Sequence, residues 1–199
     1  MRDLHVYLQE SGALRRGHFL LSSGLHSPGY VQCALLLEHP SRARQVGAAL
    51  AERLRQYRPD SVLAPALGGL IIGYEVAAAL DVPFRFCERE GAAMSIRRGF
   101  ALRKGERVEV VEDVVTTGKS TREAAAAAEG QDSAIVALAA ILDRSAGSHG
   151  FQAPFVSLME LDFPVYEPSK CPLCAEGGVA VGAGVVGQRA GGGGALDAA

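Results

Sequence analysis

The sequence predicts an α/β fold in which a mostly parallel sheet is flanked by helices. Short apolar runs alternate with helical patterns along the middle of the chain, as in repeated strand–helix–strand units. Repeated units of this kind imply parallel strands joined by right-handed crossovers, with helices covering both faces of the sheet. With 199 residues, 48% of them hydrophobic, the chain can bury a substantial core without disulfide bonds.

Local signals place the elements in chain order. A short helix is expected between Asp3, which can cap its first turn, and Ser11, after which Gly12 ends it. The next part, 17–30, is rich in turn-forming residues. The other helices are expected over 41–57, 70–80 and 121–129, and the strands over 61–64, 82–87, 108–112 and 134–142. Ligands of such sheets bind beyond the carboxyl ends of the strands, so the loops that follow the four strands are the candidate site.

Two segments differ from this regular pattern. Residues 1–181 are expected to form one domain, but 88–105 is a polar, arginine-rich excursion with the composition of a mobile lid. Residues 182–199, rich in Gly and Ala, offer little apolar surface to offset their chain entropy. We therefore expect a flexible tail there.

Charge and composition exclude several classes of protein. Twenty Lys and Arg against 22 Asp and Glu give a net charge of −2, which argues against a protein that binds nucleic acid through bulk charge. The longest apolar run, Ala134–Leu142, is too short to span a membrane, and the N-terminus lacks the apolar segment of a signal peptide. Because four cysteines are too few for a disulfide scaffold, we expect a reduced, cytoplasmic location.

One segment carries the chemistry: an apolar strand, two adjacent acids, and a loop of small polar residues before a helix. The acids are Glu112 and Asp113, and the loop runs over 116–121. Such a loop aims several backbone N–H groups at one anion, and the helix dipole favours negative charge there. The acids would repel a phosphate. They can instead accept hydrogen bonds from the vicinal hydroxyls of a sugar whose phosphate lies deeper in the loop.

Two interpretations other than a sugar-phosphate site are possible for this segment. A P-loop needs a glycine five residues before Gly118, where Asp113 stands, so the P-loop is excluded. The other is an ordinary helix cap after a strand, with both acids merely solvated. Side chains alternate along a strand, so Glu112 and Asp113 can reach one ligand only if the strand ends there.

Here the residues carry a resemblance. The segment Val110–Gly118 resembles the phosphoribosyl-pyrophosphate (PRPP) signature of type I phosphoribosyltransferases. Three more segments resemble the orotate phosphoribosyltransferases of that superfamily: Phe19–Pro28 is similar to the hood that helps hold the base, Pro65–Gly69 to the pyrophosphate loop, and Asp143–Arg144 to the pair whose arginine contacts orotate. The likeness extends to a Cys-Pro-Leu-Cys segment that recurs near the C-terminus of one bacterial branch.

The resemblance implies a fold and a reaction. The fold is that of type I phosphoribosyltransferases, with a small hood built within 1–40 and 155–181 and a flexible lid hairpin. The reaction is that of a pentosyltransferase: PRPP and orotate give orotidine 5′-monophosphate and pyrophosphate, in de novo UMP biosynthesis. The implied state is a homodimer with shared active sites, with no nucleic-acid or membrane partner. Mg²⁺ is expected through PRPP and water rather than through protein ligands.

The resemblance also implies the site residues. Those expected in catalysis are Arg89 and Asp113. Those expected to bind PRPP are Glu112, Asp113, Val114, Val115, Thr116, Thr117, Gly118, Lys119, Ser120, Arg89, Leu67 and Gly68. Those expected to bind orotate are Thr116, Arg144 and Tyr30.

The sequence departs from the family pattern at two places. Gly68 stands where much of the family has a lysine, so one charge contact to pyrophosphate is missing. Ala92 and Ala93 stand in the lid where a basic residue is usual, and Arg97 and Arg98 are candidates to compensate. The departure in the lid bears on catalytic rate more than on ligand binding.

A pair of cysteines near the C-terminus raises the question of a metal. Cys171 and Cys174 supply two soft ligands, whereas a structural zinc ion takes four. No other cysteine or histidine stands at the spacing of a second pair. The sequence therefore favours unliganded thiols.

Two other functions fit the same fold. A PRPP- or nucleotide-sensing regulator would need an added helical domain or a basic face for nucleic acid, and the sequence has neither. A phosphoribosyltransferase for a purine base is the other. The resemblance of Phe19–Pro28 to the hood of the orotate family argues against it.

Overall fold

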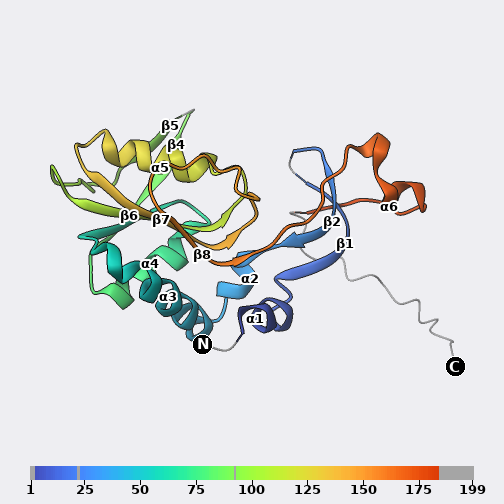
Figure 1. Cartoon of the computed structure of the whole chain (residues 1–199), viewed down its shortest axis with the longest axis horizontal. Helices are drawn as coiled ribbons and strands as arrows, with labels where there is room; N and C mark the ends of the chain where they lie inside the picture. Colours follow the sequence, from blue (N-terminus) through green and yellow to red (C-terminus); the bar gives the residue numbers. More distant parts are fainter. Residues whose placement is uncertain (1–2, 22, 92, 184–199) are drawn as a thin grey trace, which may run out of the picture. The chain divides into compact units, whose positions relative to one another are not determined.

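The computed structural model describes residues 3–21, 23–91 and 93–183, which form two compact units (Figure 1). The larger unit comprises the chain up to Leu14 together with Val31–Asp162. The smaller unit comprises Arg15–Tyr30 together with the chain from Phe163 onward. The smaller unit joins parts of the two segments predicted to build the hood.

A six-stranded sheet forms the centre of the larger unit. Its strand order is β5-β4-β3-β6-β7-β8, and all neighbours are parallel except the antiparallel pair β4 and β5. The strands are β3 (Ser61–Pro65), β4 (Phe84–Glu90), β5 (Ala93–Ile96), β6 (Arg107–Val115), β7 (Ala134–Asp143) and β8 (Phe155–Glu160). The predicted mostly parallel sheet is confirmed. β8 escaped prediction because its side chains are only half-buried and form no continuous apolar run.

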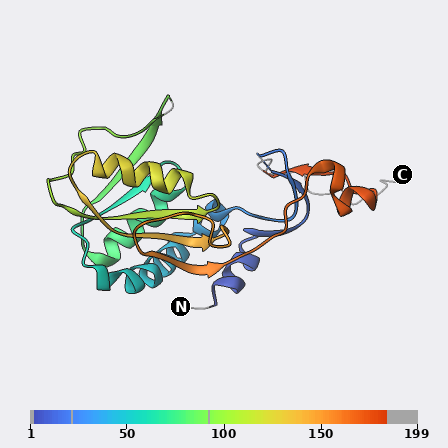
Figure 2. The same cartoon turned by 45° about the horizontal axis from the view of Figure 1, so that its top comes forward.

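Helices cover both faces of this sheet, as predicted, and Figure 2 shows them on opposite sides of the strands. α3 (Pro40–Leu54) and α4 (Gly69–Leu80) pack on one face, and α5 (Lys119–Glu129) packs on the other. A 3₁₀ turn, η1 (Arg55–Tyr57), continues α3. Two shorter helices are α1 (Leu4–Glu10), whose first turn is capped by Asp3 as expected, and α2 (Cys33–Leu37). No helix in the described part of the chain is long and apolar enough to cross a membrane.

The core of the larger unit is apolar and dry. Leu63, Val110 and Leu138, from three adjacent strands, pack under α5 against Ala124. A buried acid there is unpaired: Glu109 of β6 is fully buried, and neither of its carboxyl oxygens has a hydrogen-bond partner.

The smaller unit contains a three-stranded sheet in the order β2-β1-β9. Its strands are β1 (Leu14–Leu20), β2 (His26–Val31) and β9 (Val181–Gly182), and its other elements are the 3₁₀ turn η2 (Pro168–Lys170) and the short helix α6 (Pro172–Ala175). The sequence shows only turn-forming residues over 17–30, where the structure has two strands. The turn itself is confined to 21–25, where the Leu21 amide donates to the Leu25 carbonyl at 2.8 Å.

The predicted tail begins two residues too early. Gly182 pairs with Leu20 in β1, and the Ala183 amide donates to the Leu20 carbonyl at 3.0 Å. The rest of the predicted tail, 184–199, lies outside the described residues, as do Ser22 of the predicted hood segment and Ala92 of the predicted lid.

Candidate active site

Three adjacent strand ends bring predicted site residues to one edge of the central sheet. β3 ends in the turn at 66–68, β6 ends with the two acids and Val115, and β7 ends at Asp143, directly before Arg144. The Arg144 amide donates to the Val115 carbonyl at 2.7 Å, which joins the last two strand ends. Parallel strands expose their carboxyl ends at the same edge, and ligands bind there.

The two acids lie side by side even though β6 continues to Val115. Glu112 Oε1 accepts a hydrogen bond from the Asp113 amide at 3.1 Å, so the longer Glu112 side chain turns back along the backbone. Asp113 Oδ1 accepts one from the Val114 amide at 2.8 Å. The expectation that the acids meet only where the strand ends is therefore wrong. Strand alternation separates Cβ atoms, but two flexible carboxyl groups can still converge.

The turn after β3 approaches both carboxyl groups closely. A Cβ atom at Gly68 would lie 2.7 Å from Asp113 Oδ1. One at Gly69 would lie 2.8 Å from the Val111 carbonyl oxygen and 3.2 Å from Glu112 Oε1. Side chains at these positions would push the turn away from β6, so glycine is what permits the approach. Leu67 and Gly68 are exposed, which leaves the backbone of the turn open to a ligand.

The buried position of the acid pair changes its protonation. Burial raises the pKa of the Glu112 carboxyl, and the neighbouring Asp113 charge raises it further. Burial also raises the pKa of Asp113. Two like charges this close favour sharing a proton, whereas hydroxyl donors or a cation favour full ionisation. The pair is therefore suited to a ligand that brings such groups.

Cys33 is a neighbour of the site that the sequence did not indicate. It is the first residue of α2 and is buried. Burial and the charges of Asp113 and Glu112 raise the pKa of its thiol, and Arg144 lowers it, so all three charged groups lie within electrostatic reach. A single cysteine before a short apolar helix carries no local signal of this placement.

The loop at 116–121 forms a small hollow at the N-terminus of α5. The hollow has a volume of about 60 Å³ and is lined by Glu112, Val114, Val115, Thr116, Thr117, Gly118, Lys119, Ser120 and Thr121. Gly118 has a φ of 70°, in the left-handed region, and α5 starts at the next residue. The loop thus turns directly into the helix N-terminus, where backbone N–H groups and the helix dipole favour an anion.

The residues after β7 form a rigid connection. Asp143 Oδ1 accepts hydrogen bonds from the Ser145 amide at 2.8 Å and from the Ser145 hydroxyl at 2.6 Å. Arg144 stands between these two residues and is partly buried. Its guanidinium therefore starts from a fixed backbone at the ligand edge of the sheet.

A larger hollow of about 410 Å³ lies beside α5, lined in part by Arg122, Ile135, Leu138 and Phe151. None of the predicted site residues lines it. The smaller hollow at 116–121 is therefore the one that matches the predicted chemistry.

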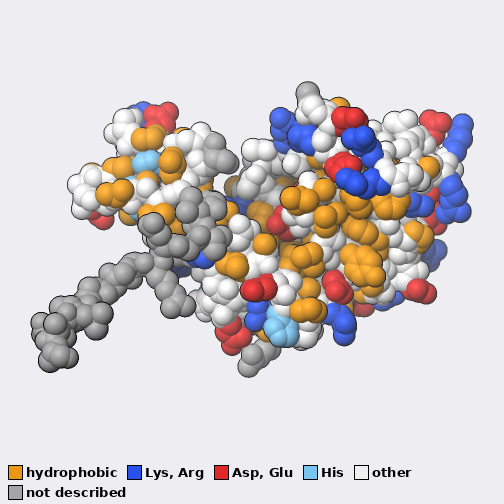
Figure 3. All heavy atoms as spheres, turned by 180° about the vertical axis from the view of Figure 1, so that it is seen from behind, with side chains coloured by type: hydrophobic (Ala, Val, Ile, Leu, Met, Phe, Trp, Pro, Cys, Tyr) orange, Lys and Arg blue, Asp and Glu red, His pale blue; other side chains and the backbone are white. Residues whose placement is uncertain are grey.

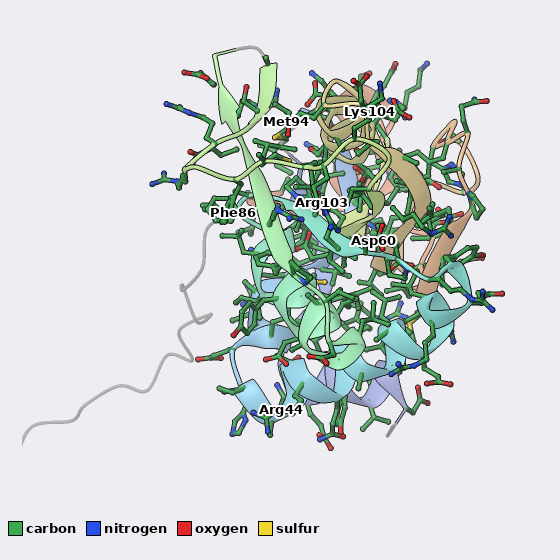
Figure 4. The ribbon with its side chains drawn as sticks, turned by 90° about the vertical axis from the view of Figure 1, so that its left-hand side faces the viewer. Arg44, Asp60, Phe86, Met94, Arg103 and Lys104 are labelled. Atoms are coloured by element: carbon green, nitrogen blue, oxygen red, sulfur yellow. The ribbon has the colours of Figure 1, made fainter. Side chains whose placement is uncertain are left out.

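The predicted lid is the hairpin of β4 and β5. Met94 of β5 packs against the cluster under α5, and Figure 4 shows it pointing from the hairpin toward that helix. On β4, the ring of Phe86 packs edge-on against Phe100, with 5.2 Å between the ring centroids. Apolar contacts thus anchor the base of the hairpin.

The arginines predicted to bind pyrophosphate are held by acids in this structure. Arg89 donates to Glu123 on α5. Arg97 pairs with Glu90 at 3.3 Å. Arg98 donates to both carboxyl oxygens of Glu88, at 3.2 and 3.0 Å, and these hydrogen bonds lower the pKa of that acid. The hairpin is docked on α5, and its cations would have to exchange partners to meet an anionic ligand.

Tyr30, predicted to bind the base, belongs to the smaller unit. It lies on β2, and its ring is tilted against that of Phe19, with 5.9 Å between the centroids. Phe19 belongs to the predicted hood segment Phe19–Pro28, and Tyr30 lies two residues after that segment.

Comparison with known proteins identifies the family. The phosphoribosyl transferase domain family matches residues 34–166. The chain is 49% identical over 170 residues to the orotate phosphoribosyltransferase of Thermotoga petrophila, which covers 85% of this chain and 91% of that protein. It is 46% identical over 178 residues to the orotate phosphoribosyltransferase of Thermus thermophilus, covering 89% and 97% of the two chains.

Solved structures agree with this assignment. The orotate phosphoribosyltransferase of Aeropyrum pernix superposes with a TM-score of 0.69 at 26% identity, covering 80% of this chain and 94% of that one. UMP synthase of Leishmania donovani gives a TM-score of 0.69 at 28% identity, covering 79% of this chain and 36% of that one. The chain belongs to the phosphoribosyltransferase family and, within it, to the orotate phosphoribosyltransferases.

Proposed function

We propose that this protein transfers the ribose 5-phosphate group of PRPP to orotate, giving orotidine 5′-monophosphate and pyrophosphate. One observation carries the proposal in a chain of this family. The acid pair, the glycine turn after β3 and the 116–121 loop meet at one edge of the sheet. PRPP is a sugar with a phosphate at one end and a pyrophosphate at the other. It needs one group for the ribose hydroxyls, one for the 5′-phosphate and one for the pyrophosphate.

Each part has a role that follows from its chemistry. Glu112 and Asp113 accept hydrogen bonds from the ribose hydroxyls, and each such bond to a charged group contributes about 1.5–3 kcal/mol. The loop 116–120 holds the 5′-phosphate through backbone N–H groups and hydroxyls. The backbone of Leu67 and Gly68 meets the pyrophosphate. Thr116 and Arg144 hold orotate, the arginine through a planar fork that matches a carboxylate.

The site suits Mg²⁺ carried by the substrate. Mg²⁺ is typically held by one or two carboxylates together with substrate phosphates, and it keeps several waters. Glu112 and Asp113 serve the ribose hydroxyls, and the described residues hold no group of three metal-ligating side chains at this edge of the sheet, so PRPP oxygens and water would hold the ion. The bound ion would neutralise charge on the pyrophosphate.

Catalysis then rests on positioning and charge. The bond from the anomeric carbon to pyrophosphate breaks and a bond to a ring nitrogen of orotate forms, through an oxocarbenium-like transition state by analogy with other displacements at that carbon. Pyrophosphate leaves with the electron pair of the broken bond, and the proton of the attacking ring nitrogen passes to the pyrophosphate or to water. Arg89, once released from Glu123, would stabilise the departing anion, and the hairpin would exclude water.

We also propose a homodimer, supported by an exposed apolar face beside the pyrophosphate turn. Leu67, Ile71 and Tyr74 are 83%, 47% and 62% exposed on the turn and on α4. Figure 3 shows hydrophobic side chains gathered on one face of the larger unit. A second copy that covered this face would border the turn at Gly68, so the two sites could share residues.

The four free cysteines are compatible with the expected cytoplasmic location.

Subunit exchange tests whether the site is shared. Inactive Arg89→Ala and Asp113→Asn homodimers are mixed and allowed to exchange. If hairpin and acid serve one site from different chains, each heterodimer has one site with both lesions and one intact site. It should then have about half the activity of the wild-type dimer. No recovery, with exchange confirmed by native mass spectrometry, would confine each hairpin to the site of its own chain.

The reaction is tested with purified protein, PRPP and Mg²⁺ against a panel of bases. Pyrophosphate release should require orotate and be absent with adenine, hypoxanthine or uracil. Release with a purine instead would replace orotate as the substrate. Binding of PRPP without turnover of any base would favour the sensing regulator.

A further inference from the structure

The smaller unit gathers four metal-ligating side chains from distant parts of the chain. His18 of β1, His26 of β2, Cys171 and Cys174 each place one ligand atom within 4.8 Å of the others. The expectation of unliganded thiols assumed that no second pair of ligands exists. That premise is wrong, because the neighbouring strands β1 and β2 bring two histidines beside the cysteines.

The distances between these atoms match those around a tetrahedral zinc ion. Zn–S bonds of about 2.3 Å and Zn–N bonds of about 2.0–2.1 Å imply S···N separations of about 3.6 Å and an N···N separation of about 3.3 Å. The Sγ atoms of Cys171 and Cys174 lie 3.5 and 3.7 Å from His18 Nε2. Cys174 Sγ lies 3.3 Å from His26 Nδ1, and the two ring nitrogens are 2.9 Å apart.

Ordinary hydrogen bonding does not account for this crowding. His18 Nε2 has three neighbours within 3.7 Å: two sulfurs and one ring nitrogen. A ring nitrogen carries one proton or one lone pair and can serve one strong hydrogen bond. A cation at the centre contacts all four atoms at once. Two thiolates with two imidazoles in a tetrahedral arrangement are a set that selects zinc.

The surroundings fix His18 in the tautomer that zinc requires. His18 Nδ1 lies 3.2 Å from the carbonyl oxygen of Gly178, so it donates there and leaves the Nε2 lone pair directed at the cluster. A Cβ atom at Gly178 would lie 3.2 Å from that same ring nitrogen and 2.8 Å from the Leu173 carbonyl oxygen. Glycine thus allows the carbonyl to approach the ring.

The described residues of the smaller unit form no apolar core that could hold it without a metal. Among its described residues, only His26, Ser27, Gly29 and Cys171 are buried. Two of these four are members of the cluster. Small units that bury little apolar surface are typically held by disulfides or metals, and all four cysteines here are free thiols.

We propose that His18, His26, Cys171 and Cys174 bind one Zn²⁺ ion, which joins strands β1 and β2 to the C-terminal segment. Because protein ligands fill all four positions, the site is structural rather than catalytic. It stands apart from the proposed transferase reaction, whose failure would leave it untouched.

Zinc content tests the proposal directly. Tag-free protein is dialysed and its zinc measured by inductively coupled plasma mass spectrometry. Wild type should carry about one zinc per chain, and a Cys171→Ser/Cys174→Ser variant less than about one-tenth. Cys87→Ser is the matched control, since it removes a buried thiol from the larger unit and should keep the zinc.

Two further measurements keep the outcome clear if the double variant folds poorly. His18→Cys should retain zinc, because a thiolate can replace the imidazole. Wild type refolded with Co²⁺ should gain the visible absorption of tetrahedral thiolate coordination. Zinc below one-tenth per chain in wild type, both as purified and after refolding with Zn²⁺, would overturn the proposal. Full zinc in the double variant would do the same.

Discussion

The two units bury different kinds of side chain. In the larger unit the fully buried positions include the apolar side chains Leu63, Ile72, Ile141 and Leu142, from the sheet and the helices on its faces. In the smaller unit the buried positions are small or polar, and two of them face the cysteine–histidine cluster. The larger unit can therefore be stabilised by apolar burial alone, whereas the smaller one depends on directed bonds.

The largest effect should come from a cavity in the larger unit. Leu63→Ala removes a fully buried side chain of β3 and should lower the free energy of unfolding by about 2–5 kcal/mol, measured by denaturant titration. The control is Val179→Ala, which truncates a side chain that is 84% exposed and does not belong to the proposed dimer face, and it should change stability by less than about 0.5 kcal/mol. Equal losses in both variants would mean that burial is not what holds this unit.

The acid pair separates the ligand site of the larger unit from the metal site of the smaller one. Glu112→Ala/Asp113→Ala removes two charge-assisted acceptors and should weaken PRPP binding by roughly 3 kcal/mol, measured by calorimetry. The same protein should still carry one zinc. Unchanged PRPP affinity would show that Glu112 and Asp113 do not bind the ribose. Loss of zinc would show that the two sites are coupled.

Two buried acids, Glu106 directly before β6 and Glu109 within it, show what a partner contributes to a buried polar group. Glu106 accepts hydrogen bonds from the Ser61 hydroxyl and the Arg85 guanidinium, both at 2.6 Å, and from the Arg103 amide at 2.8 Å. Burial alone would raise its pKa, but these partners lower the pKa of Glu106 to about 2. Glu109 has no partner, and burial raises its pKa to about 8.

The two acids should give opposite pH dependences. The neutral form of Glu109 is favoured in the folded state, so its stability contribution is lost as pH rises from about 4.5 toward 8, at about 1.4 kcal/mol per pH unit. The contribution of Glu106 is present above about pH 4.5 and is lost as pH falls toward 2. Relative to wild type, Glu109→Gln should therefore gain stability as pH rises, and Glu106→Gln should gain it as pH falls. If the melting temperatures of wild type and Glu109→Gln change with pH in the same way between pH 5 and 8, Glu109 does not titrate there.

The smallest effect concerns the hairpin on the surface of the larger unit. Glu123→Gln removes the partner of Arg89, an exposed ion pair of the kind that contributes less than about 1 kcal/mol. We expect faster hydrogen exchange in β4 and β5 and little change in global stability. Glu129→Gln, at the other end of α5, removes the same charge and should leave the hairpin unchanged. If both variants behave alike, the Arg89 pair does not hold the hairpin.

Strong periodic patterns made most of the larger unit predictable. The strands β3, β6 and β7 and the glycine-bounded helix α5 each lie within a few residues of their predicted positions. The acid pair and its loop follow from the same pattern, because the end of a parallel strand is where ligands bind. Their convergence with Gly68 also required the neighbouring order of β3 and β6, which no local signal contains.

The smaller unit resisted prediction for the opposite reason. Its strands are short, contain glycine and proline, and bury little, so neither alternation nor apolar runs mark them. The metal-ligating set joins residues 18 and 26 to residues 171 and 174, and only the fold brings these distant segments together. Cys33 is a third case: the charges of the acid pair raise the pKa of its thiol, and no local pattern in the sequence indicates that relation.

The close approach of Gly68 to Asp113 constrains how this enzyme could be changed. A lysine at position 68 would place its Cβ against the carboxylate, and moving Asp113 aside would break the hydrogen bond from the Val114 amide. Restoring the cation common in the family therefore requires a second adjustment in β6. Positions 68 and 113 form a linked pair. A side chain at position 68 fits only if Asp113 also changes, so either substitution made alone gives a poorly fitting turn. A library that varies both positions together would find routes that single substitutions cannot.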